Sequence, residues 1–228
     1  MSAIIPVVSI IVPVLNEAAV VSELIAGLQW YQTRCEILIV DGGSRDDTVA
    51  QCERAGFKVI HSERGRARQM NAGAQAARGD ILLFLHADTR LPSDADQFII
   101  AALEDGQRHW GRFDVRIAGS AWLLPVIAIL MNLRSRLTGI ATGDQAIFVR
   151  RTEFEAAGGF PDQPLMEDIE LSLRLRRRSK PVCLTGPVIT SGRRWETRGV
   201  MRTILLMWRL RLAYAFGASA EALAKDYR

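Results

Sequence analysis

Three apolar runs in the first ninety residues each lead into an acidic residue. The runs are VSIIVPV, ILIV and ILLFL, and the acids after them are Glu17, Asp41 and Asp88. Short Val, Ile and Leu runs without polar alternation are typical of parallel strands buried on both faces. Ligands of open α/β sheets bind beyond the carboxyl ends of such strands. We therefore expect these acids to converge on one crevice that takes a polar, phosphate-bearing or metal-bound ligand.

Helices are expected between these runs. In the first interval Val20, Leu24 and Leu28 recur at helical spacing, and shorter helices are expected over 48–56 and 64–79. Strand and helix then alternate as βαβαβαβ. This alternation predicts an α/β fold with a parallel, right-handed, doubly wound sheet.

The pattern changes after Pro92. Further strands are expected over 110–119 and 143–151, helices over 93–103, 122–137, 152–159, 166–178 and 201–217, and short strands or loops over 181–192. The sequence contains no linker, repeat or low-complexity tract. We therefore expect one domain over residues 1–228 with a divided site.

The charge balance is basic, with 29 Lys and Arg against 25 Asp and Glu, and all but three of the basic residues are Arg. The planar guanidinium suits bidentate phosphate contacts, although solvated helix faces account for most of these residues. No stretch interleaves basic and aromatic residues as nucleic-acid-binding segments do, so we expect no nucleic-acid partner.

The cysteines and the apolar segments indicate the compartment. Cys35, Cys52 and Cys183 form no CxxC pair and are typical of a reduced compartment. The first residues lack the basic region of a signal peptide, and the longest apolar run, 121–131, is too short to span a bilayer. We expect a cytoplasmic protein, with a peripheral place at the inner face of the membrane as the alternative.

The first half of the chain offers two candidate ligand contacts. Asp41 precedes Gly42 and Gly43, and a carboxylate that ends a buried strand needs a partner, such as a ligand amide or a ribose hydroxyl. Asp88 with a diphosphate would form a site for Mg²⁺ or Mn²⁺. The alternative for Asp88 is a turn cap, and His86 is open to three roles: metal ligand, phosphate contact or packed side chain.

The second half adds two pairs. Glu167 and Asp168 stand where an amphipathic helix is expected to begin. Two roles are open for them: a general base, or caps of the helix N-terminus. Arg193 and Arg194 precede Trp195 in an expected loop, either to stabilise a departing diphosphate or as a surface loop with an aromatic lid on the core.

Five motifs in order resemble those of the GT-A-fold nucleotide-diphospho-sugar transferases, in glycosyltransferase family 2, over nearly the whole chain. They are VSIIVPVLNE, IVDGGSRDDT, MNAGAQAARGDILLFLHADT, GGFPDQPLMEDIELSLRLR and SGRRW. The resemblance implies a GT-A fold with a nucleotide-sugar-binding half over 1–91 and an acceptor and catalytic half over 92–228. RGRARQMNAG, FLHADT and TGDQAIFVRR also resemble a bacterial subgroup, the radical-SAM/selenodomain-associated transferase 2 proteins.

The resemblance implies an inverting glycosyltransferase with Asp168 as general base, Asp88 as the Mn²⁺ or Mg²⁺ ligand, and a small-molecule or lipid acceptor. The implied nucleotide-sugar contacts are Pro13, Asn16, Glu17, Asp41, Arg66, Asn71, His86, Ala87, Arg193, Arg194 and Trp195. The implied acceptor contacts are Gly143, Asp144, Gln145 and Glu167.

The chain departs from the family pattern at Gly42, His86 and Ser191, where an acid, an acid and Gln are usual. A non-catalytic nucleotide-sugar-binding protein therefore stays an alternative, although Asp88 and Asp168 are retained. A sugar-phosphate nucleotidyltransferase is a second alternative. Such an enzyme is expected to have a Gly-rich loop with a basic residue just after the first strand, whereas residues 15–17 of this chain are Leu, Asn and Glu. The helices over 122–137 and 201–217 are open to two interpretations: contact with an anionic membrane, or packing against the acceptor cleft, the core or a dimer partner.

Overall fold

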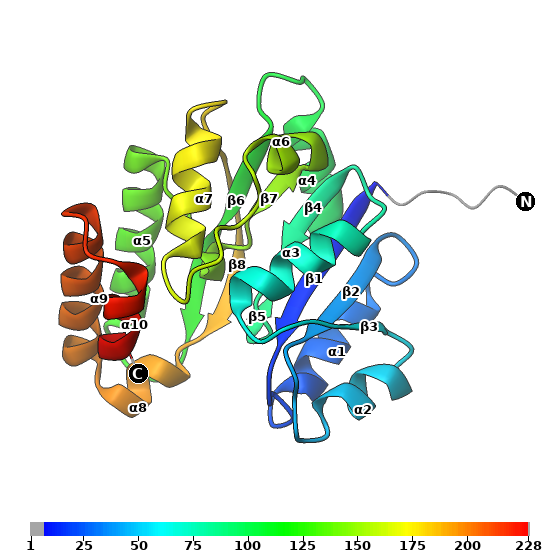
Figure 1. Ribbon diagram of the computed structural model, residues 1–228, viewed down its shortest axis with the longest axis horizontal. Coiled ribbons are helices and arrows are strands. Elements are labelled where there is room, and N and C mark those ends of the chain that lie inside the picture. Colours follow the sequence, from blue (N-terminus) through cyan, green and yellow to red (C-terminus); the bar gives the residue numbers. More distant parts are fainter. Residues whose placement is uncertain (1–6, 228) are drawn as a thin grey trace, which may run out of the picture.

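Eight strands form one mixed sheet in the computed structural model, which describes residues 7–227 (Figure 1). The strands are β1 (Val8–Val14), β2 (Glu36–Asp41), β3 (Lys58–His61), β4 (Ile81–Phe84), β5 (Thr89–Arg90), β6 (Trp110–Ala118), β7 (Phe148–Arg150) and β8 (Val182–Ser191). Their order across the sheet is β3-β2-β1-β4-β7-β6-β8-β5. The expectation about a signal peptide falls partly on residues 1–6, outside the described residues.

Strands β1 to β4 run parallel, as the alternation of strands and helices predicts. β1 lies between β2 and β4, with Val14 opposite Asp41 and Ile11 opposite Phe84. Every residue of β2 and β4 is buried. The carboxyl ends of these strands therefore meet at one edge of the sheet.

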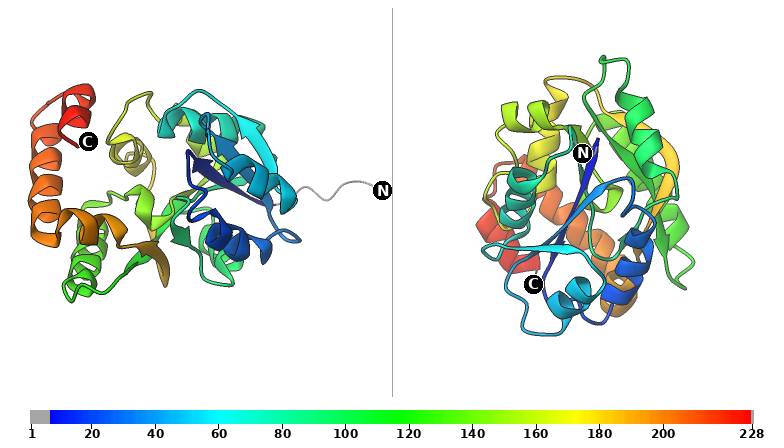
Figure 2. Two further views of the ribbon diagram at one scale, coloured as in Figure 1. Left: turned by 90° about the horizontal axis from the view of Figure 1, so that it is seen from below. Right: turned by 90° about the vertical axis from the view of Figure 1, so that its right-hand side faces the viewer.

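Helices cover both faces of the sheet (Figures 1 and 2). They are α1 (Val21–Gln29), α2 (Thr48–Arg54), α3 (Arg66–Ala76), α4 (Ala95–Leu103), α5 (Leu124–Thr138), α6 (Arg151–Ala156), α7 (Glu167–Arg176), α8 (Arg193–Arg198), α9 (Val200–Ala215) and α10 (Ala220–Tyr227), with a 3₁₀ turn, η1 (Gly143–Gln145). One core joins α1, α2 and α4 to the sheet, and a second joins α3, α6 and α7. Gly73 lets α3 approach closely, because a Cβ there would lie 2.4 Å from Ile11 Cγ2.

The second half differs from the sequence prediction at four elements. The strand expected over 143–151 is confined to β7 (Phe148–Arg150), because Gly143–Gln145 form the 3₁₀ turn η1, which the Thr142 and Gln145 side chains cap. Residues 182–191 form one strand, β8, where short strands or loops were expected over 181–192. Pro187 is accommodated because the pairing of β8 with β6 is irregular between Phe113 and Val115. Arg193–Arg198 form the helix α8 where a loop was expected, and α10 follows α9.

A short link brings the two halves together at the site. β5 pairs with the end of β8, with Thr89 opposite Thr190. Only residues 85–88 separate β4 from β5. Four residues span at most about 14 Å, so the end of β8 lies near the end of β4. The backbone N–H of Ser191 donates to the carbonyl oxygen of Asp88 (3.1 Å), and α8 begins directly beyond it.

The remaining helices lie at the outer side of the second half. α5 packs on β6, and α9 and α10 pack on each other beyond it (Figures 1 and 2). Within residues 7–227 no helix has the length and apolar character needed to cross a membrane.

Candidate functional site

The carboxyl edge of the parallel strands gathers two of the three acids at the surface. Glu17 lies close enough to Asp88 and Asp46 for their negative charges to act on it. Partial burial is the main cause that raises the pKa of Glu17. The two carboxylates raise it further, and the Arg193 guanidinium opposes the shift. Asp88 is exposed. A group of neighbouring carboxylates is a place where a cation or a hydrogen-bond donor of a ligand would bind favourably.

Asp41 lies at the same edge but is buried below the surface. Its carboxylate accepts hydrogen bonds from the backbone N–H groups of Gly43 (3.0 Å) and Ser44 (3.0 Å), and His61 Nδ1 lies 3.4 Å away. Burial raises the pKa of Asp41, but these hydrogen bonds outweigh it, so the pKa lies below its ordinary value. The protein itself therefore supplies the partner that a carboxylate at the end of a buried strand needs.

His86 and Asp144 form a pair across the two halves. His86 Nδ1 lies 3.2 Å from Asp144 Oδ1, and the pairing lowers the pKa of Asp144 against the effect of burial. The ring packs on Gly143, where a Cβ would lie 2.2 Å from His86 Nε2. That Nε2 is buried and has no hydrogen-bond partner among the described residues.

Asp168 is held at the first turn of α7 by backbone donors. Its Oδ2 accepts from Gly143 N–H (2.8 Å) and its Oδ1 from Ile169 N–H (2.7 Å). Burial first, and then the neighbouring Glu167 carboxylate, raise the pKa of Asp168 to about 6 against the effect of those donors and of Arg66. A carboxylate with this pKa can take up a proton near neutral pH, as a general base must.

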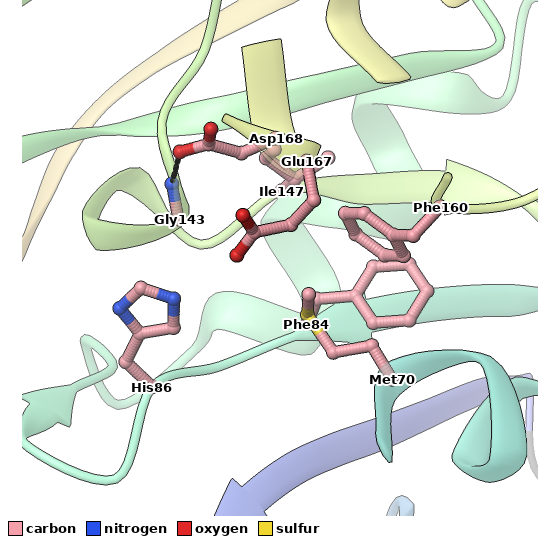
Figure 3. A pocket seen from close by; sticks show the side chains of 8 residues that line it. All are labelled: Met70, Phe84, His86, Gly143, Ile147, Phe160, Glu167 and Asp168. Atoms are coloured by element: carbon pink, nitrogen blue, oxygen red, sulfur yellow. Dashed lines mark hydrogen bonds between the residues drawn. The ribbon is translucent and has the colours of Figure 1, made fainter. Parts of the chain in front are cut away.

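Glu167 joins the halves at the floor of the site. It is buried, and its Oε1 lies 3.2 Å from Nη1 of Arg66, the first residue of α3. Figure 3 shows its carboxylate pointing into a small cavity between His86 and the Phe84 and Phe160 rings. The residues that line this cavity are Met70, Phe84, His86, Gly143, Ile147, Phe160, Glu167 and Asp168.

Positive charge collects opposite these acids. Burial first, and then Arg198 and Arg66, lower the pKa of Arg194, while Asp144 and Asp88 oppose this shift. The Arg194 guanidinium also lies over the Tyr227 ring, 4.2 Å from its centroid. Arginines that repel one another beside an exposed carboxylate favour a polyanion that approaches together with a cation.

Asp88 suits a divalent cation that the ligand helps to hold. Its only hydrogen bond among the described side chains is a long one from Thr89 Oγ1 (3.5 Å). In the part of the chain that the structure describes, no three His, Cys, Asp or Glu side chains gather as a metal site. The residues therefore fit Mg²⁺ or Mn²⁺ with one carboxylate, phosphate oxygens and waters, which is the usual Mg²⁺ arrangement.

Several expected contacts have other roles in the structure. Gln145 is fully buried, caps η1 through Thr142 and donates to Asn132 (3.3 Å), so its side chain does not face an acceptor. The Asn71 amide bonds both backbone groups of Phe160. Trp195 packs against the apolar cluster that includes Leu124 on α5. This matches the second role considered for it, an aromatic side chain that covers the core.

The other expected nucleotide contacts lie at the strand ends. Pro13 belongs to β1 and is partly buried, Ala87 packs at the edge of a core, and Asn16 is exposed with φ 54°. The Asn16 Oδ1 accepts from Arg45 N–H (2.8 Å), which ties the β1 loop to the β2 loop.

Arg134 on α5 is a site residue that sequence reasoning missed. Its Nε and Nη2 are buried and lack hydrogen-bond partners among the described residues. Burial first lowers the pKa of Arg134, and the nearby Asp168 and Asp144 oppose this shift. The available signal was weak: Arg134 lies in the polar last turns of a helical segment that begins apolar, next to Asn132 and Arg136.

Relatives were found by sequence. The family model described as "Glycosyl transferase family 2" matches residues 9–153. The undecaprenyl-phosphate 4-deoxy-4-formamido-L-arabinose transferase of Pseudomonas savastanoi pv. phaseolicola is 28% identical over 155 residues, or 63% of this chain and 46% of that protein. The probable glycosyltransferase YdaM of Bacillus subtilis is 26% identical over 237 residues, or 93% of this chain and 55% of that protein. The chain spans about half the length of these curated relatives.

Solved structures share the fold. TarS of S. aureus, residues 1–349 in complex with UDP-GlcNAc, superposes with a TM-score of 0.65 at 17% identity, over 81% of this chain and 58% of that one. The mannosyltransferase PcManGT of Pyrobaculum calidifontis, in complex with GDP-Man and Mn²⁺, superposes with a TM-score of 0.66 at 21% identity. The superposition covers 97% of this chain and 69% of that one. These likenesses, with the mainly parallel sheet and its flanking helices, show the GT-A fold. The family match covers more than half of the residues, and the chain belongs to glycosyl transferase family 2.

Proposed function

We propose that the protein is an inverting glycosyltransferase that moves a sugar from a nucleotide-diphospho-sugar to an acceptor hydroxyl. The observation that carries the proposal is the convergence at one sheet edge of an exposed carboxylate, Asp88, crowded arginines, and a carboxylate of raised pKa, Asp168. The solved structures of the same fold that bind UDP-GlcNAc or GDP-Man support this ligand class.

In this proposal the donor lies across the strand ends. Pro13, Asn16, Glu17 and Asp41 frame the nucleotide. Arg66, Arg193 and Arg194 face the diphosphate, since arginine recognises phosphate oxygens bidentately. Residues 1–91 thus bind the donor, residues 92–228 supply the acceptor side, and the two halves act as one domain.

The reaction is a single displacement. The acceptor oxygen bonds to the anomeric carbon while the bond from that carbon to the diphosphate oxygen breaks. The electron pair leaves with the nucleoside diphosphate, and the acceptor proton goes to an Asp168 oxygen. Attack opposite the leaving group inverts the anomeric configuration. Positioned proton transfer of this kind contributes about 10² to 10⁴ in rate.

A divalent cation fits the donor side. Asp88 would hold Mn²⁺ or Mg²⁺ together with the donor phosphates. When bound, the cation would neutralise charge on the departing diphosphate. Arg193 and Arg194 supply further positive charge from α8.

The acceptor side of the proposal rests on Asp144 and Gly143. Asp144 lies beside His86 and near Arg66. Gly143 has no side chain, so the His86 ring can pack directly on its backbone. The relatives named as undecaprenyl-phosphate transferases support a lipid acceptor as one of two candidate classes, with a small molecule as the other. Membership of the radical-SAM/selenodomain-associated transferase 2 subgroup, which the sequence motifs resemble, is also part of this proposal.

Thermal unfolding with a panel of UDP-, GDP- and dTDP-sugars, with and without Mn²⁺, tests the donor class. A bound donor raises the apparent melting temperature, by an amount set by its concentration over Kd. The proposal expects one nucleotide class to stabilise the protein, more strongly with Mn²⁺, and to be turned over. Stabilisation without any release of nucleoside diphosphate would instead support a non-catalytic binding protein.

A further inference from the structure

Helix α9 carries an exposed apolar stripe. Its members recur at intervals of three and four residues, and each is more than half exposed: Met201, Leu205, Trp208, Leu212 and Phe216. Residues at this spacing lie on one side of a helix. The opposite side, with Leu210, is buried against α10 and the segment before α7.

Helix α5 and the residues just before it carry a second stripe. Its exposed members are Trp122, Val126, Ile129, Leu130, Leu133 and Leu137. The opposite side of α5 packs on β6, and the beginning of α9 joins the same apolar cluster through Val200 and Ile204. The two helices are therefore neighbours, and both leave apolar faces uncovered. Exposed apolar surface on this scale is typical of an interaction site.

The charged residues that α5 and α9 themselves place beside the stripes are all arginines. Arg202 and Arg209 are exposed and lie two turns apart beside the α9 stripe, and Arg136 borders the α5 stripe. Neither helix contains Asp or Glu. Arg136 and Arg209 each pair with an acid on another element, while Arg202 is solvated at the border.

We propose that the α5–α9 face docks on the surface of an anionic lipid bilayer. The stripes would enter the headgroup region while the bordering arginines contact lipid phosphates. Trp122 and Trp208 are 80% and 74% exposed, and tryptophan is enriched at this depth because its ring is apolar with one polar edge.

Charge favours the bilayer over a second copy of the chain. In a two-fold dimer the same patch faces itself. Arg136 and Arg209 are already paired with Asp114 and Asp226, but Arg202 would face only the arginines of the partner's α5 and α9, because neither helix contains an acid. An anionic lipid surface supplies the opposite charge for Arg202.

The docking face is joined to the site. α9 and α10 pack on Leu165 and Met166, directly before Glu167, and Asn132 of α5 accepts a hydrogen bond from Gln145 in η1. A docked chain would hold its Asp168 side close to the bilayer. The docking itself does not rest on the proposed glycosyl transfer, because it needs neither donor nor acceptor.

Co-sedimentation of the whole chain with vesicles tests the proposal. One set contains phosphatidylcholine alone and the other contains phosphatidylcholine with phosphatidylglycerol. We expect the protein to sediment with the anionic vesicles, less with the neutral ones, and less again at high salt. The Trp208→Ser, Leu212→Ser double variant should bind at least about tenfold more weakly, since each change removes an apolar side chain that docking would bury. Arg202→Gln should weaken anionic binding about fivefold and leave neutral binding unchanged.

The matched control is Phe98→Ser on α4, which removes a comparably exposed aromatic ring from another face. It should bind vesicles like the wild type. Circular dichroism checks that each variant is folded. Absence of vesicle binding by the folded wild type would overturn the proposal. Equal loss in the control would also overturn it, as would a dimer in sedimentation velocity that dissociates in the double variant without any vesicle binding.

Discussion

Asp168 combines a raised pKa with fixed geometry, so its titration should appear in the rate. Its pKa of about 6 means that it is ionised at neutral pH and protonated below. Because a base must be unprotonated, we expect kcat/KM to fall about tenfold per pH unit below 6 and to be level above it. A pH–rate profile checks this, and a flat profile between pH 7 and 5 would contradict it.

Protonation of Asp168 does not unfold the protein, so unfolding through this group would not explain the predicted fall in kcat/KM at low pH. The folded-state pKa of Asp168 lies above its ordinary value of 3.8, so the folded state binds more protons between about pH 4 and 6. The contribution of Asp168 to the free energy of unfolding therefore falls as pH rises through this window and grows as pH drops. Circular dichroism along the same pH series serves as the control.

Gly143 allows the close approach that places two site groups. A Cβ at this position would lie 2.2 Å from His86 Nε2, so Gly143→Ala must displace the ring from Asp144 or move the N–H that binds Asp168. We expect the transfer rate to fall at least about tenfold, since small misplacements of reacting groups are costly. Gly186→Ala, whose Cβ would meet only Phe98 at 3.9 Å, is the matched control and should keep its rate. Equal rates for both variants would contradict this account of Gly143.

At the scale of elements, α8 is expected to control nucleotide affinity. Arg194 faces Asp88 and Asp144 from this helix. Removing a hydrogen bond to a charged group costs about 1.5 to 3 kcal/mol, so Arg194→Gln should weaken nucleoside diphosphate binding at least about tenfold. Calorimetry measures it, with Arg54→Gln on the exposed side of α2 as control. Unchanged affinity in Arg194→Gln would remove α8 from the donor site.

The elements also show what the sequence could and could not predict. Buried parallel strands leave long apolar runs, so β1, β2 and β4 could be read directly. The six residues of α8 are too few to display a helical period, which is why Arg193 and Arg194 were expected in a loop. Short strands or loops were expected over 181–192, because the irregular pairing with β6 that accommodates Pro187 within one strand depends on tertiary contacts.

Individual side chains were harder to predict than strands. Gln145 suits an acceptor contact by residue type, yet its side chain is buried and bonded to Asn132. The backbone donors that hold Asp41 could likewise not be read from its place in the sequence. Arg134 gave little signal, because its place beside Asp168 depends on how α5 packs in the fold. Spacing along the chain says where a residue lies, but not which neighbour has already used its polar atoms.

At the scale of the whole molecule, the Arg66–Glu167 pair joins the halves. Glu167 is buried, so Arg66→Met would leave its charge unpaired and lower the free energy of unfolding by about 2 kcal/mol. Adding Glu167→Gln should restore most of that stability, because the neutral side chain is cheaper to bury. Denaturant unfolding of the single and double variants checks this. Equal stability of wild type and Arg66→Met would show that the pair does not hold the halves together.

The central claim is that a donor bound by the first half reacts through a base from the second half. The direct measurement is the transfer rate of Asp168→Asn at saturating donor, with donor Kd measured on the same sample and Glu170→Gln on α7 as control. We predict a rate at least about a hundredfold below wild type, an unchanged donor Kd, and a control that behaves as wild type. An Asp168→Asn variant that binds the donor and retains most of its transfer rate would contradict the account.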